Sequence, residues 1–99
     1  MKELEQLNKI SNLQDKLESL GYHFMTTRHN FKIEQHDFLV TDRNYYGIMF
    51  GSLSFDEEGN FIIFKAVVLG VPSQFVRIHN IIEKNTNFYE NKPWLTKKE

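Results

Sequence analysis

Residues 45–69 form the sequence YYGIMFGSLSF-DEEGN-FIIFKAVVL, two apolar runs joined by an acidic turn with a glycine near its end. This pattern predicts two antiparallel strands, 45–55 and 61–69, connected by a five-residue loop. Simple alternation makes both faces of the second strand apolar, because side chains in a strand point alternately to opposite faces. It places Phe61, Ile63, Val67 and Leu69 on one face and Ile62, Phe64, Ala66 and Val68 on the other. A strand of this kind needs cover on both faces.

The first part of the chain carries an apolar stripe with the spacing of a helix. Leucine and isoleucine recur every three or four residues between Glu3 and Leu20, which predicts one amphipathic helix over that range. Gly21 follows where a left-handed residue would end the helix. The stripe consists of Leu4, Leu7, Ile10, Leu13, Leu17 and Leu20.

Between this helix and the central hairpin we expect two further strands. Tyr22–Arg28 alternates weakly, His29-Asn30 is a candidate turn, and Phe31–Thr41 alternates again. Asp37 interrupts the second alternation, so a bulge near His36-Asp37 is expected.

After the hairpin, the apolar residues of Ser73–Lys84 fit both a helical stripe and the alternation of a strand. We predict a helix there, because Pro72 and Ser73 supply a helix start signal. Residues 85–99 are polar with scattered aromatic side chains and are expected to form an irregular tail. The predicted fold class is therefore α+β: an N-terminal amphipathic helix packed on a four-stranded, mainly antiparallel sheet, then a second helix and the tail. The first helix would shield one face of the sheet, and the second, being short, would cover the opposite face incompletely.

Composition limits the functional classes. Ninety-nine residues with 40% apolar content predict a single folded domain, residues 1–99. The absence of cysteine excludes disulfides, thiolate metal sites and cysteine nucleophiles, and it favours a cytoplasmic protein. Charges are interleaved around a formal net charge of −1, and no apolar run is long enough to span a bilayer. Nucleic acid and membranes are thus poor candidates for partners.

No motif for catalysis, a metal or a cofactor is present, so we expect a protein that is not an enzyme and that has no catalytic, metal-binding or cofactor-binding residues. The four histidines lack the spacing of a zinc site. His23 and His36 would face each other if the chain turned at His29-Asn30. Glu57 and Glu58 are adjacent, but a solvent-exposed turn is not the cleft that paired carboxylates need.

Two alternatives to protein binding remain open from the residues. Gly47, Met49 and Gly51 would share one strand face, where missing side chains leave room for a packed helix or for a small ligand, as in a small-molecule sensor. A nucleic-acid-binding module would instead combine basic and aromatic residues on the sheet. Its candidate residues are Arg28, Lys32, Arg43 and Tyr45.

The preferred function is binding to another protein or to a second copy of the chain, as a small cytosolic module. The residues Asn, Lys, Ile, Phe and Tyr, whose codons are AT-rich, are abundant, which suggests a low-GC bacterium or its phage. A phage- or mobile-element-encoded inhibitor or regulator of the anti-defence type, or a bacterial immunity or adaptor protein, would have these properties. The expected interaction residues are aromatic or apolar. They are Tyr46, Ile48, Phe50, Tyr89 and Trp94.

Overall fold

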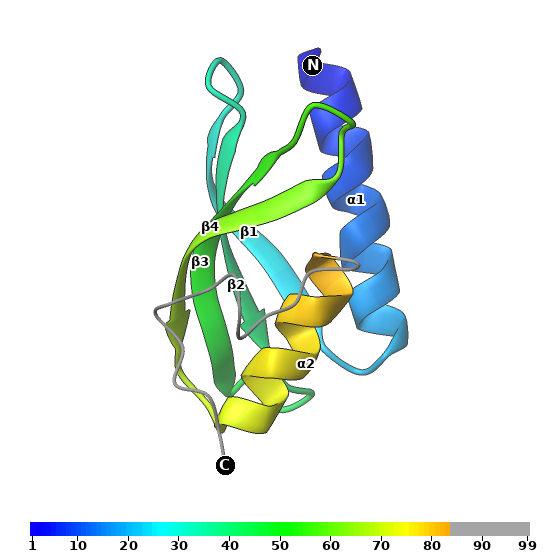
Figure 1. Cartoon of the computed structure of the whole chain (residues 1–99). Coiled ribbons are helices and arrows are strands. Elements are labelled where there is room, and N and C mark those ends of the chain that lie inside the picture. The colour runs from blue at the N-terminus through cyan, green and yellow to red at the C-terminus, as the bar shows by residue number, and fades with distance from the viewer. Residues whose placement is uncertain (84–99) are drawn as a thin grey trace.

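The computed structural model describes residues 1–83, so the predicted tail, with Tyr89 and Trp94, lies outside the described residues. Within these residues, two helices and four strands follow one another (Figure 1). They are α1 (Glu3–Ser19), β1 (His23–Asn30), β2 (Gln35–Thr41), β3 (Gly47–Phe55), β4 (Phe61–Val68) and α2 (Pro72–Ile82). The α+β prediction is confirmed, including the helical choice for the segment after Pro72.

The strands form an antiparallel meander in the order β1-β2-β3-β4. Both helices pack against the same face of this sheet, which we call the inner face (Figure 1). The expectation that the second helix covers the opposite face is therefore wrong. Apolar side chains of both helices join those of the strands in one core on that face, and three-residue connections keep each helix beside the strand that it adjoins. The core between helices and sheet contains Leu17 from α1, Phe75 and Ile78 from α2, and Phe24, Phe38, Val40, Met49, Leu53 and Ile63 from the strands.

The buried face of α1 is narrower than the predicted stripe. Gln6, Ile10, Leu13 and Leu17 are buried, whereas Leu4, Leu7 and Leu20 are exposed. A helix turns through about 100° per residue, so the nine residues from Leu4 to Leu13 leave these two side chains on opposite sides of the helix. Gln6 lies within about 20° of Leu13 by the same reasoning, which is why a polar residue occupies a core position. Gly21 has a φ of +93° and ends the helix as predicted.

The first hairpin turns later than predicted. Residues 31–34 form the turn, so Phe31 is not the start of a strand and His29 pairs with His36, while His23 pairs with Thr41. The bulge expected in β2 lies instead in β1, where Thr27 is skipped between the pairs Thr26–Phe38 and Arg28–Asp37.

Two further bulges decide which side chains of the central hairpin are buried. Phe64 is skipped in β4, since Lys65 pairs with Ser52 and Ile63 pairs with Leu53. Alternation therefore changes phase: Val67 joins Ile62 on the outer face, contrary to the simple pattern, and Ala66 and Val68 turn to the inner face. Ile48 is skipped in the same way in β3.

Gly51 has a packing role at the centre of the sheet. A side chain there would meet the carbonyl oxygen of Lys65 and, at 3.2 Å, the ring of Phe38. Phe38 and Met49 are both fully buried. The space left by the glycine is thus taken by an aromatic ring of the chain itself, and the structure gives no support to a ligand site at Met49.

Leucine truncation on opposite sides of α1 tests this packing. Leu17 is 0% exposed and Leu4 is 68% exposed. We predict that Leu17→Ala lowers the free energy of unfolding by about 2–5 kcal/mol, because it removes buried methyl groups and leaves a cavity. Leu4→Ala is the matched control and should change it by less than about 0.5 kcal/mol. Urea denaturation measures both, and equal effects would show that α1 does not dock as described.

Candidate interaction surface

The face of the sheet opposite the helices, which we call the outer face, carries an apolar row that crosses all four strands. Met25 pairs with Leu39, Leu39 with Phe50, and Phe50 with Val67, so the four side chains are direct neighbours. Met25, Phe50 and Val67 are 37%, 36% and 46% exposed, and Leu39 is half-buried. No residue among 1–83 covers this row, because both helices lie on the inner face.

A polar row lies beside the apolar row. Arg28 pairs with Asp37, Asp37 with Ser52 and Ser52 with Lys65, again one residue from each strand. The Ser52 hydroxyl donates a 2.5 Å hydrogen bond to Oδ1 of Asp37, which partly satisfies the only carboxylate of the row. A hollow of about 320 Å³ at this end is lined by Arg28, Asn30, Ile33, Gln35 and Asp37.

Aromatic side chains border the opposite end of the outer face. The ring of Tyr45 stacks on His23 with 4.1 Å between ring centroids and an angle of 1° between planes. Tyr46 follows it in the same turn and is 71% exposed. The outer face therefore has an apolar centre between a polar edge and an aromatic edge.

The predicted protein-interaction residues differ in their exposure to solvent. Tyr46 and Phe50 are exposed, as a contact role requires, but Ile48 is 1% exposed and belongs to the core. Its selection was wrong because the bulge in β3 turns this residue inward. Tyr89 and Trp94 lie outside the described residues, so their roles stay predictions. Sequence reasoning missed Met25, Leu39 and Val67, which only the strand register brings together.

The residues proposed for nucleic acid are not gathered in one place. Arg28 and Lys32 belong to the β1–β2 end of the sheet, whereas Arg43 and Tyr45 belong to the β2–β3 turn at the other end of β2. A seven-residue strand separates these ends by roughly 23 Å. The four residues do not form the continuous basic stripe that phosphate binding requires.

Two of the four histidines meet in a network that links β1, β2 and α1. Nδ1 of His29 lies 2.8 Å from Nδ1 of His36, and Nε2 of His36 lies 2.7 Å from Oε1 of Gln6. The Gln6 amide nitrogen donates to the carbonyl oxygens of Met1 and Phe31. The predicted encounter of His23 with His36 is wrong, because the later turn places His29 opposite His36.

These contacts fix the hydrogen positions in the network. Since the Gln6 nitrogen faces two carbonyl groups, its oxygen faces His36 and accepts a hydrogen bond from Nε2–H. Neutral His36 then has a bare Nδ1, which accepts the Nδ1–H of His29. Burial is the main cause that lowers the pKa of His36, the neighbouring His29 lowers it further, and Glu34 and Asp37 act in the opposite direction.

The remaining chemistry of residues 1–83 is limited. This part of the chain holds no cluster of three or more histidine, aspartate or glutamate side chains that could bind a metal ion. Nor does it hold a helix long and apolar enough to cross a bilayer. What the geometry presents most clearly is a surface for contact.

The histidine network predicts a dependence of stability on pH. Because the pKa of His36 is lower in the folded chain than its ordinary value of 6.5, the unfolded chain binds more protons below that pH. The contribution of His36 to the free energy of unfolding is complete above pH 6.5 and is lost as the pH falls through and below that value. For the binding of one proton, the loss is no more than about 1.4 kcal/mol per pH unit. Urea denaturation between neutral and acidic pH should show a flatter pH profile for His36→Gln. Parallel profiles would contradict this assignment.

Comparison with protein-family models, with curated proteins and with solved structures found no match for this chain.

Proposed function

We propose that this protein binds another protein through the outer face of its sheet. The observation that carries the proposal is the apolar row Met25–Leu39–Phe50–Val67, which is contiguous and bordered by polar and aromatic side chains. Leu39 is half-buried and the other three side chains of the row are exposed. Large contiguous apolar patches are rare on the surfaces of monomeric proteins, and where they occur they often mark interaction sites. An apolar centre with a polar rim is also the usual anatomy of a protein interface.

Charge favours a foreign partner with an acidic contact surface. The polar row contains two cations, Arg28 and Lys65, and one anion, Asp37, whose carboxylate already accepts the hydrogen bond from Ser52. A partner with apolar side chains at its centre and carboxylates opposite Arg28 and Lys65 would complement both rows. Tyr46, exposed beyond the sheet, offers a further contact of the kind that is enriched in interfaces.

A second copy of the chain fits this surface less well. Strands of 7–9 residues at the usual strand spacing give the face an area of roughly 500 Å², so two copies would bury about 1,000 Å² in total. That is the lower limit for a specific interface, and it applies equally to a foreign partner, so charge rather than area distinguishes the two occupants. Two identical faces would also add cations to a contact that already has an excess of them.

Residues 84–99 are the other candidate from within the chain. They contain four lysines and two glutamates, a formal charge of +2. A basic segment does not complement a face whose free charges are cations. Charge complementarity therefore favours an acidic partner over this segment as well.

Binding without chemistry suits an inhibitor, a regulator or an adaptor. The absence of catalytic motifs and of a candidate metal cluster in residues 1–83 is compatible with that role. The lack of cysteine suits the cytosol, where disulfides are rare.

Introducing a charge into the apolar row of the outer face tests the proposal. Phe50→Lys and Val67→Lys place a cation in the apolar row, and Leu4→Lys makes the same kind of change on the exposed side of α1. The wild-type chain and Leu4→Lys should capture the same partner from a lysate of the source organism. Both row variants should weaken that binding by about 30-fold or more, the range of a central interface residue.

Three results would contradict the proposal. Equal capture by all four proteins would place the contact elsewhere, and failure to capture any protein would leave the face without a foreign occupant. A dimer in analytical ultracentrifugation that Phe50→Lys dissociates would identify a second copy as the occupant. Urea denaturation of each variant ensures that loss of binding is not loss of folding.

A further inference from the structure

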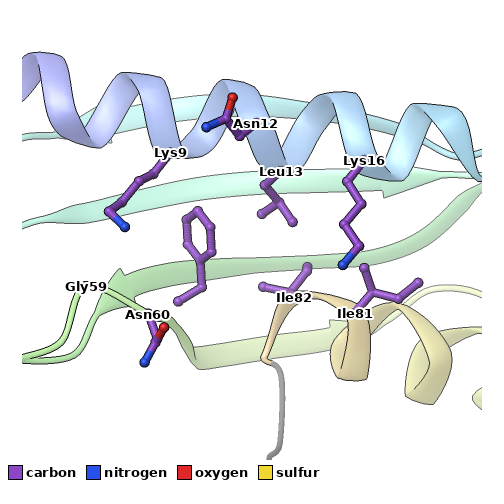
Figure 2. Close-up of a pocket in the computed structure, with 9 residues that line it drawn as sticks. Lys9, Asn12, Leu13, Lys16, Gly59, Asn60, Ile81 and Ile82 are labelled. Atoms are coloured by element: carbon purple, nitrogen blue, oxygen red, sulfur yellow. The ribbon is translucent and has the colours of Figure 1, made fainter.

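A second site lies on the other side of the molecule, between α1, the β3–β4 turn and α2. A cavity of about 290 Å³ opens there, close to the lower limit for small-molecule pockets. Figure 2 shows Leu13 on α1 and Ile81 and Ile82 on α2 around the same space. Leu13 and Ile82 are buried, Ile81 is half-buried, and the ring of Phe61 completes an apolar floor.

Two lysines from α1 border this floor. Lys9 and Lys16 both extend from the helix toward the cavity, one on each side of Leu13 (Figure 2). Seven residues of helix separate their backbones by about 10 Å along the helix axis. Within residues 1–83, neither lysine forms a salt bridge.

We propose that this cavity binds an elongated small molecule with an apolar middle and an anionic group at each end, such as an aliphatic dicarboxylate. The apolar middle would lie on Leu13, Phe61 and Ile82, and each lysine would pair with one end. A compact single anion fits less well, because the two ammonium groups lie toward opposite ends of the floor. This site is independent of the outer face.

The two ends of the site are not equivalent. Lys9 also lines a neighbouring polar cavity with Asp56, Glu57 and Glu58, so acidic side chains compete for its charge. Lys16 does not line that cavity and contributes to the apolar one alone. Pairing at Lys16 is therefore expected to contribute more to binding than pairing at Lys9.

Titration followed by amide NMR on the full chain tests the site directly. Decanedioate is the probe, with decanoate and decanediol as controls of similar length that carry one charge and none. Decanedioate should shift the amide signals of Asn60 and Ile82 and leave those of Phe50 and Val67 unchanged. Affinity should decrease in the order decanedioate, decanoate, decanediol.

Charge-removing variants locate the anion contacts. Lys16→Gln should weaken decanedioate binding about three- to five-fold, the range of a partly exposed ion pair, and Lys9→Gln should weaken it less. Lys32→Gln removes the same charge from the β1–β2 turn, where Lys32 does not line the cavity, and should have no effect. No shifts at millimolar decanedioate, shifts confined to the outer face, or equal losses for Lys16→Gln and Lys32→Gln would each overturn the proposal.

Discussion

Burial of apolar side chains between the helices and the inner face of the sheet is the interaction on which the rest of this structure depends. Leu17, Phe38 and Phe75 come from α1, β2 and α2 and are all fully buried. Truncation of such side chains typically costs several kcal/mol, a large fraction of the stability of a small domain. Because both helices contribute to this one core, it is built on one side of the sheet only.

The same constraint creates the candidate interaction surface. Because both helices pack on the inner face, no helix within residues 1–83 covers the apolar row through Leu39 and Phe50 on the outer face. Exposed apolar side chains in adjacent strands carry a risk of aggregation unless a specific partner covers them. The proposed function follows from this imbalance: the fold needs only one face of the sheet, and the other is available for contact.

Local signals in the sequence predicted the helices and strands. The register between paired strands instead determined the face of the sheet on which each side chain lies. Gly21 and Pro72 act on their own backbone, so the end of α1 and the start of α2 could be predicted. The bulges at Ile48 and Phe64 depend on the facing strand, and they changed the burial of Ile48 and the face of Val67. Tyr46 and Phe50 of the candidate surface were predicted from the sequence. The complete apolar row and the lysine-lined cavity could not be predicted, because each combines residues from segments that are distant in the sequence.

The proposed interaction surface requires an outer face that is open to solvent and an inner face that is buried. Relaxation of methyl signals by a soluble gadolinium chelate tests this requirement on the full chain at low concentration. We predict strong relaxation for the methyl groups of Met25 and Val67 and weak relaxation for those of Leu53 and Ile63, which the helices cover. Protection of Val67 equal to that of Ile63 in a monomer would show that the chain covers its own outer face, and would rule out an open interaction surface there.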